Sequence, residues 1–195
     1  ATAAVGATFS STSPDFGTAG VLDRFGQIEP TVLVAADGYV YGGKANDCRP
    51  RLAEIRRGLP TLRRTIVVPY LATDLPTGVE PWPDVLAAHA GADLAPQRYP
   101  FDHPGYVLYS SGTTGKPKAI IHRTGGVLLK HLVEHQLHCD VRPGDRVFYF
   151  TTAGWMMWNW LASGLASGAT LVLYDGSPSY PPSVLFDLAD EQGVT

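Results

Sequence analysis

The chain has 195 residues, 45% of them apolar, a length and composition that predict one domain with a proper hydrophobic core. Because only 17% of the residues are charged and the net charge is −3, the chain has no basic field for nucleic acid or anionic lipid. No apolar run reaches the roughly 18 residues that a membrane span requires. The two cysteines, Cys48 and Cys139, lie far apart in sequence, which favours a reducing, cytoplasmic setting over a disulfide framework.

Apolar runs bounded by turn residues alternate with helix-period segments, a pattern typical of α/β folds built from strand–helix units. Asp15 or Thr18 is the expected N-cap of the first helix. Residues 71–104 are rich in proline and are expected to form a surface excursion. The elements predicted for the first half are, in chain order, a helix over 18–28, a buried strand over 31–36, a helix over 51–57, a strand over 64–68 and a helix over 82–89.

The second half contains one long predicted helix, over 126–138, and we expect its apolar side to be formed by Val127, Leu128, Leu132 and Val133. No internal repeat is visible in the chain. The remaining elements predicted here are, in chain order, a strand over 119–122, a strand over 146–150, a helix over 155–166, a strand over 169–174 and a helix over 182–191.

The most informative stretch is the decapeptide at 109–118, which follows an apolar, strand-like run. Its glycines let the backbone approach a bulky anion and adopt positive φ. Its hydroxyl and N–H groups can donate hydrogen bonds to phosphate oxygens, and its lysines can balance the charge. The stretch therefore predicts a polyphosphate site, with a nucleotide as the first candidate ligand. The candidate phosphate-binding residues are Ser110, Ser111, Gly112, Thr113, Thr114, Gly115, Lys116 and Lys118.

This loop is not a Walker A loop, which needs G-x-x-x-x-G-K-[ST] opening into a helix. Gly112 and Gly115 are only three residues apart, and Lys116 is followed by Pro117, which biases the chain toward extended geometry. We therefore expect a strand–loop–strand. A flexible glycine-rich linker is the alternative, but linkers lack the Pro-Lys ending and the flanking strands.

The loop resembles the phosphate-binding signature of the adenylate-forming enzymes, a family that includes acyl-CoA synthetases, luciferases and peptide-synthetase adenylation domains. Four further segments resemble the acetoacetyl-CoA synthetase (acetoacetate–CoA ligase) branch of that family, and the likeness runs from end to end. They are SPDFG at 13–17, VLDRF at 21–25, TTAGWMMWN at 151–159 and YDGSP at 174–178.

The resemblance implies that residues 1–195 are an internal part of an N-terminal, AMP-binding domain, with a C-terminal domain outside the chain. It implies a ligase that uses ATP to activate acetoacetate as an acyl-adenylate and then transfers the acyl group to coenzyme A. The loop would hold the β- and γ-phosphates. The glutamate that binds Mg²⁺ and the catalytic lysine are expected outside this chain, so the isolated chain is expected to be inactive.

Three alternatives to this function remain open. The protein could be a ligase for another short acid, such as acetate or propionate. It could be a nucleotide-binding module without catalysis, or a non-functional piece of an incomplete reading frame. No G-x-S-x-G elbow occurs in the chain, which removes the common serine hydrolase interpretation.

The aromatic and sulfur-rich segment at 155–159 is the second candidate site. The resemblance implies that it forms the wall of the acyl pocket and the pantetheine tunnel, with its asparagine as a polar anchor. Acetyl-CoA synthetases carry a Trp-Val-Thr-Gly-His-type segment here, and the departure from it favours acetoacetate over acetate. Plain core packing is the alternative for each residue. The residues are Trp155, Met156, Met157, Trp158 and Asn159.

His131, His135 and His138 share one face of the predicted helix over 126–138. Their spacing can bind a metal, but no carboxylate pattern supports such a site, so a solvated helix face is favoured and no metal site is predicted. His122 can orient the loop or pack in its strand. Residues 174–179 follow a strand and are favoured as a simple turn, with a loop near coenzyme A as the alternative.

Overall fold

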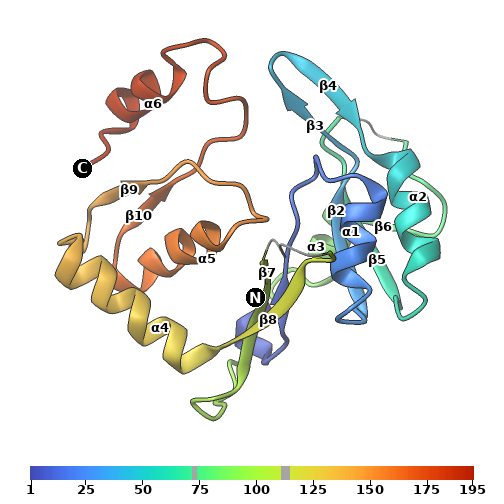
Figure 1. Ribbon diagram of the computed structural model, residues 1–195, viewed down its shortest axis with the longest axis horizontal. Coiled ribbons are helices and arrows are strands. Elements are labelled where there is room, and N and C mark those ends of the chain that lie inside the picture. Colours follow the sequence, from blue (N-terminus) through green and yellow to red (C-terminus); the bar gives the residue numbers. More distant parts are fainter. Residues whose placement is uncertain (72–73, 111–114) are drawn as a thin grey trace. The chain divides into compact units, whose positions relative to one another are not determined.

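The computed structural model describes residues 1–71, 74–110 and 115–195, which form two compact units. Unit I comprises residues 1–11, 95–108 and 120–195, and unit II comprises residues 12–94 and 109–119. Both units mix helices with pairs of parallel strands (Figure 1). The prediction of an α/β fold is confirmed.

A sheet in the order β2-β5-β6 forms the centre of unit II. Strand β2 pairs in parallel with β5 from Val32 opposite Arg64 to Ala36 opposite Val68, and β5 pairs in parallel with β6. The elements of this unit are α1 (Thr18–Phe25), β2 (Val32–Ala36), β3 (Gly38–Tyr41), β4 (Lys44–Asp47), α2 (Arg49–Gly58), β5 (Arg64–Val68), β6 (Glu80–Pro81) and α3 (Trp82–Ala88).

Helices α1 and α2 cover one face of this sheet and close the core of unit II. The core members are Val21, Phe25, Leu33, Leu52, Ile55, Leu59 and Val67. Side chains of a strand alternate between its two faces. Leu33 of β2 therefore lies in the core, whereas Val32 and Val34 are about half exposed, at 50% and 54%. The predicted strand is present, but the prediction that it is buried holds for Leu33 and not for Val32 or Val34.

A two-stranded antiparallel hairpin, β3–β4, was not expected from the sequence. Its turn residues, Gly42 and Gly43, have φ angles of 56° and 75°. Positive φ at both central residues is what a type I′ hairpin turn requires, and glycine adopts it without steric cost. The Gly-Gly pair between Tyr-Val-Tyr and Lys-Ala-Asn is therefore the sequence signal that could have predicted the hairpin.

In unit I, β1 pairs in parallel with β7, and β9 pairs in parallel with β10. Strands β7 and β8 belong to one sheet, in the order β1-β7-β8, and each runs on into unit II. The elements are η1 (Thr2–Val5), β1 (Phe9–Ser10), β7 (Pro104–Ser110), β8 (Lys118–Arg123), α4 (Thr124–Leu132), η2 (Val133–His138), β9 (Arg146–Phe148), α5 (Met156–Ser163), η3 (Gly164–Ser167), β10 (Thr170–Val172) and α6 (Val184–Gln192).

Several predicted elements change character or end early. Gly17, not Asp15 or Thr18, is the N-cap of α1, because the Thr18 hydroxyl donates to the Glu54 carboxylate at 2.7 Å. The helix predicted over 126–138 begins two residues earlier and continues after α4 as η2, a π-helix. The helix predicted over 155–166 is α5 followed by the 3₁₀ turn η3.

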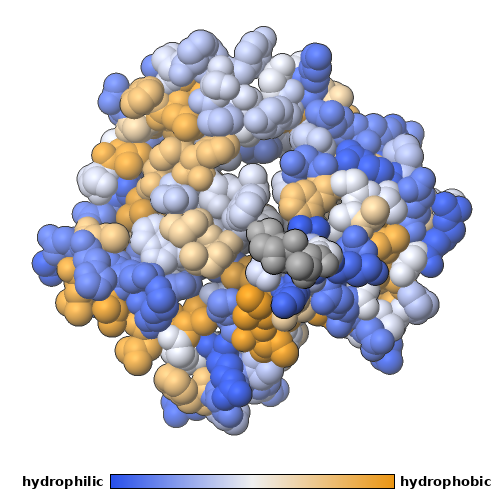
Figure 2. All heavy atoms as spheres, in the orientation of Figure 1, coloured by the Kyte–Doolittle hydropathy of each residue, from blue (hydrophilic) through white to orange (hydrophobic). Residues whose placement is uncertain are grey.

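None of the helices in the described ranges combines the length and the apolar character needed to cross a membrane. Figure 2 shows apolar surface, in orange, alternating with hydrophilic surface on the face viewed. Large apolar side chains are exposed at many described positions, among them Leu137 and Phe186 at 76% each. Both cysteines, each a described residue, are free thiols.

Candidate functional site

The predicted phosphate loop joins the end of β7 to the start of β8, as the expected strand–loop–strand requires. Four of its predicted residues, Ser111, Gly112, Thr113 and Thr114, lie outside the described residues. The other four are placed: Ser110 ends β7, Lys118 begins β8, and Gly115 and Lys116 lead into β8. Gly115 has a φ of 147°, a backbone conformation that favours glycine.

Helix α1 and the turn that follows it hold both flanks of this loop within unit II. The Lys116 ammonium lies 3.3 Å from a carboxylate oxygen of Asp23, and the Gln27 side-chain amide donates to the Pro117 carbonyl at 2.8 Å. On the β7 side, the Arg24 guanidinium lies 5.9 Å from the centre of the Tyr109 ring. The residues on either side of the loop therefore contact α1 or the turn that follows it, and sequence reasoning missed these contacts.

The second predicted site lies on α5 and its N-cap, Trp155, in unit I. Trp155 and Met156 are exposed, at 64% and 48%, while Met157 and Trp158 are half-buried. Asn159 is buried, and its side-chain nitrogen has no hydrogen-bond partner among the described residues. An unpaired buried donor is costly. The segment thus offers exposed apolar side chains and one buried polar group.

Two of the three helical histidines are buried, so the prediction of a solvated face was wrong for His131 and His135 and holds only for the exposed His138. Nδ1 of His131 lies 2.9 Å from Oγ of Ser163, and Nε2 of His135 lies 2.9 Å from the carbonyl oxygen of Trp160. One ring nitrogen of each histidine thus finds a partner on α5, which makes burial more tolerable. Burial lowers the pKa of His131 below its ordinary value.

The predicted apolar side of the same helix is correspondingly displaced. Leu128 and Val133 are exposed, at 41% and 39%, while Val127 and Leu132 are half-buried. The helix turns His131 and His135 toward α5, where they form hydrogen bonds that a leucine could not form. Figure 1 shows α4 running alongside α5, and contacts between the two helices agree.

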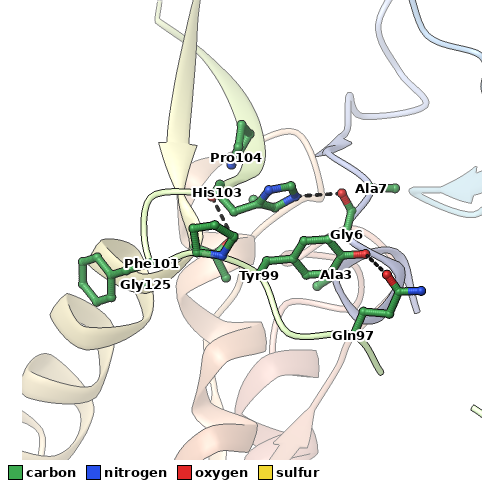
Figure 3. Close-up of a pocket in the computed structure, with 12 residues that line it drawn as sticks. Ala3, Gly6, Ala7, Gln97, Tyr99, Phe101, His103, Pro104 and Gly125 are labelled. Carbon is green, nitrogen blue, oxygen red and sulfur yellow. Dashed lines mark hydrogen bonds between the residues drawn. The ribbon is translucent and has the colours of Figure 1, made fainter. Parts of the chain in front are cut away.

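A cavity of about 300 Å³ opens in unit I between η1, the segment before β7 and the start of α4. Nε2–H of His103 donates to the Gly6 carbonyl oxygen at 2.9 Å, and the His103 ring stacks on Tyr99 with centroids 4.4 Å apart (Figure 3). Because Gly6 accepts this bond through its carbonyl, Nε2 is the donor. None of the predicted site residues lines this cavity.

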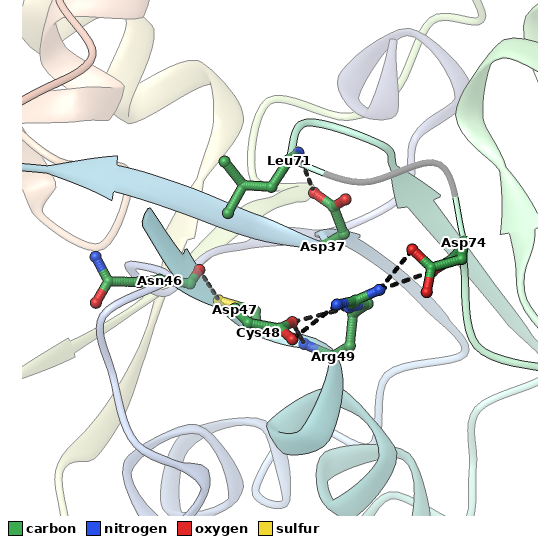
Figure 4. A network of polar contacts seen from close by, with 7 residues as sticks. All are labelled: Asp37, Asn46, Asp47, Cys48, Arg49, Leu71 and Asp74. Atoms are coloured by element: carbon green, nitrogen blue, oxygen red, sulfur yellow. Dashed lines mark hydrogen bonds and ion pairs between the residues drawn. The ribbon is translucent and has the colours of Figure 1, made fainter. Parts of the chain in front are cut away.

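A polar network in unit II links the segments that follow β2 and β5 (Figure 4). The buried Asp37 carboxylate accepts backbone N–H bonds from Tyr70 at 2.8 Å and from Leu71 at 2.9 Å. Arg49 bridges two carboxylates, Asp47 at 3.0 Å and Asp74 at 2.8 Å. The hydrogen bond from Arg49 lowers the pKa of Asp47. The network shapes the loops at the carboxyl ends of two parallel strands.

No three His, Cys, Asp or Glu side chains converge as metal ligands within the part of the chain that the structure describes. Mg²⁺ prefers carboxylate and other oxygen ligands in near-octahedral geometry. The hydroxyl and ammonium groups of the described loop flanks do not form such a set of ligands.

A glycine-, hydroxyl- and lysine-rich segment between two strands of an α/β fold is the feature shared with the adenylate-forming enzymes. The profile of the family described as AMP-binding enzyme matches residues 1–195, and the chain therefore belongs to that family. The resemblance to the adenylate-forming enzymes is confirmed.

Relatives with a narrower description match over almost the whole chain. It is 54% identical, over 97% of its length, to the acetoacetyl-coenzyme A synthetase of Rhizobium meliloti (strain 1021), and 47% identical over its whole length to the acetoacetyl-CoA synthetase of Gallus gallus. The solved acetoacetyl-CoA synthetase from Streptomyces lividans matches the whole chain with a TM-score of 0.95 and 53% identity. The chain spans about 30% of the length of these relatives.

Proposed function

We propose that the whole protein is an ATP-dependent acid–thiol ligase that activates acetoacetate as an acyl-adenylate and transfers the acyl group to coenzyme A. The observation that carries the proposal is the glycine-, hydroxyl- and lysine-rich loop between β7 and β8, in a chain that matches acetoacetyl-CoA synthetases from end to end. A cytoplasmic location fits these substrates and the two free thiols.

In this proposal the loop binds the β- and γ-phosphates of ATP. The hydroxyls of Ser110, Ser111, Thr113 and Thr114 donate hydrogen bonds, Gly112 and Gly115 supply backbone N–H groups, and Lys116 and Lys118 supply positive charge. Preorganised donors aimed at the leaving pyrophosphate stabilise the charge that develops as the acyl-adenylate forms. The contacts of Gln27 with Pro117 and of Arg24 with Tyr109, one on each flank of the loop, support such preorganisation.

The segment Trp155–Asn159 forms the wall of the acyl pocket and the tunnel for coenzyme A. Small-molecule pockets combine apolar walls with a few polar groups, and the exposed Trp155 and Met156 beside the unpaired nitrogen of Asn159 offer that combination. An acid with a polar group beyond its carboxylate would satisfy the Asn159 donor, and the oxo group of acetoacetate is such a group.

Within the whole protein, residues 1–195 act as part of the N-terminal, AMP-binding domain. The Mg²⁺ ligand and the catalytic lysine come from outside these residues, so the isolated chain is inactive. The length of the relatives, of which the chain spans about 30%, supports this division.

A ligase for a different short acid is the second candidate. One relative, 41% identical over the whole chain, is the malonamoyl-CoA synthetase vrtB of Penicillium aethiopicum. A relative named for a different acid is the observation that favours this candidate. A module that binds ATP without catalysis is the remaining alternative.

The test is ATP–pyrophosphate exchange by the full-length protein, supplied in turn with acetoacetate, acetate, propionate and 3-hydroxybutyrate. Exchange that strongly favours acetoacetate supports the proposal. Exchange with another acid keeps the adenylation step and replaces the substrate. ATP binding without exchange on any acid would leave only the nucleotide-binding alternative.

A further inference from the structure

A buried polar cluster ties α5 to the helix pair α4–η2, and the proposed reaction gives it no role. It consists of His131, His135 and Ser163, together with the carbonyl oxygen of Trp160. His131 is 4% exposed and His135 is fully buried. The Ser163 hydroxyl lies 2.6 Å from the Trp160 carbonyl oxygen, 2.9 Å from His131 and 3.3 Å from His135.

The chemistry of the partners fixes the direction of each hydrogen bond. The Trp160 carbonyl only accepts, so both the Ser163 hydroxyl and Nε2–H of His135 donate to it. With its proton committed, the Ser163 oxygen accepts from Nδ1–H of His131. The two histidines are therefore opposite tautomers, one with its hydrogen on Nδ1 and the other with its hydrogen on Nε2.

The cluster also has a packing component. The His135 ring lies against the Trp160 ring, with centroids 4.2 Å apart, and the Tyr149 ring meets Trp160 edge-on at 5.9 Å. Nδ1 of His135 is buried without a hydrogen-bond partner among the described residues, so the polar contacts of this ring all pass through Nε2 and the ring face supplies the rest. His135 lies in η2, and single π-helical turns are frequent at functional sites.

The cluster contacts the second half of α5, and the first half of the same helix belongs to the segment assigned to the acyl pocket. Trp160 follows Asn159 in the chain, and Ser163 lies one helical turn further on. A helix moves as a rigid body over so short a distance, so the contacts at Trp160 and Ser163 determine where Met156 and Asn159 lie. Small displacements of positioning groups reduce catalysis strongly.

We propose that His131, His135 and Ser163 are positioning residues that fix the register of α5 and thereby set the selectivity of the enzyme among short carboxylic acids. This inference rests on the proposed ligase function and on the assignment of residues 155–159 to the acyl pocket. It adds residues that do not touch the substrate and that act through α5.

The test uses the full-length enzyme and compares matched substitutions. His131→Asn and His135→Gln retain an N–H donor close to the positions of Nδ1 and Nε2, whereas His131→Leu and His135→Leu remove the donor. Ser163→Ala removes the shared hydroxyl with the least change in volume. His138→Asn, on the exposed side of η2, is the control. The measurement is kcat/KM for acetoacetate and for butyrate, which lacks the oxo group, together with KM for ATP.

We expect Ser163→Ala and the two leucine variants to lower the acetoacetate-to-butyrate ratio about tenfold, because α5 can then shift from the position that favours the oxo acid, and small misplacements have effects of at least that size. KM for ATP should stay within about twofold, and the two amide variants should recover most of the selectivity. Folded Ser163→Ala enzyme with an unchanged ratio would overturn the inference. An equal loss on both acids, accompanied by lower thermal stability, would also overturn it.

If the leucine variants do not fold, Ser163→Ala and the amide variants still decide the question. Failure of the inference is distinct from failure of the proposed function. In the first case the unmodified enzyme exchanges pyrophosphate in the presence of acetoacetate and only the selectivity prediction fails. In the second case the unmodified enzyme shows no acid-dependent exchange.

Discussion

The Lys116 ammonium and the Asp23 carboxylate form an ion pair, 3.3 Å between Nζ and Oδ1, where the chain leaves the predicted phosphate loop. Both side chains are accessible to solvent, Lys116 at 77% and Asp23 at 39%. Exposed pairs of this kind contribute less than about 1 kcal/mol. Asp23 is therefore a weak partner that a polyphosphate, with several negative charges, can replace.

We expect Asp23→Asn in the full-length enzyme to lower KM for ATP by up to about threefold, because Lys116 no longer has to leave a carboxylate. Thermal stability should change little, since the pair is exposed. Asp15→Asn, which removes an exposed carboxylate outside this pair, is the control. A KM for ATP that rises in Asp23→Asn would mean that the carboxylate holds Lys116 in its productive position.

Gly125 and Gly126 are neighbours in α4, and a methyl group added to each meets different surroundings. A Cβ on Gly125 would lie 2.3 Å from the Phe101 ring, whereas a Cβ on Gly126 has no described atom within 4 Å. The Phe101 ring, which is 67% exposed, has to shift to make room, so Gly125→Ala should lower the stability by up to about 1 kcal/mol. Gly126→Ala should raise it by about 0.5–1 kcal/mol, because alanine is the better helix former. Thermal unfolding of the two variants measures the difference, and equal Tm values would contradict it.

Most secondary structure could be predicted because it follows local patterns. Strand β5 matches its predicted range, and α3 starts at the predicted residue with Pro83 in its first turn. The hairpin around Gly42 was missed although its turn signal is local. The burial of His131 could not be predicted, because its partner Ser163 lies 32 residues away and no pattern in the sequence couples them.

The candidate site could be predicted only where residue types themselves specify chemistry. The loop at 109–118 combines glycine, hydroxyl and lysine residues, and that combination points to phosphate. Contacts such as Asp23 with Lys116, or Gln27 with Pro117, join residues about 90 positions apart. Such pairs depend on how α1 and the turn after it pack against the residues before β8, which a single sequence does not specify.

Leu161 and Leu165 give a second matched pair, on α5 and on η3. Leu161 is 1% exposed, whereas Leu165 is 63% exposed. Leu161→Ala should lower the free energy of unfolding by about 2–5 kcal/mol, because it removes buried methyl groups and leaves a cavity. Leu165→Ala should change it by less than about 0.5 kcal/mol. Chemical or thermal unfolding of the full-length variants compares them, and similar losses in both would mean that Leu165 is covered by other parts of the protein.

The burial of His131 predicts a loss of stability in acid. Burial in the contact between α4 and α5 lowers the pKa of His131 below its ordinary value of 6.5, which is the value it regains on unfolding. The neighbouring charges act less strongly: Glu134 raises the pKa, while Lys130, His135 and His122 lower it. Between the lowered folded pKa and 6.5 the unfolded state binds more protons than the folded state, so stability falls as the pH falls through this window.

We therefore expect the contribution of His131 to the stability to be complete above pH 6.5. The Tm of the full-length protein should decrease as the pH is lowered from there. His131→Asn keeps a hydrogen-bond donor but cannot take up a proton, so its Tm should depend less steeply on pH over the same window. His138→Asn should retain the slope of the unmodified protein, because that side chain is exposed. A slope that is unchanged in His131→Asn would show that other groups, such as His122, whose pKa burial also lowers, cause the acid sensitivity.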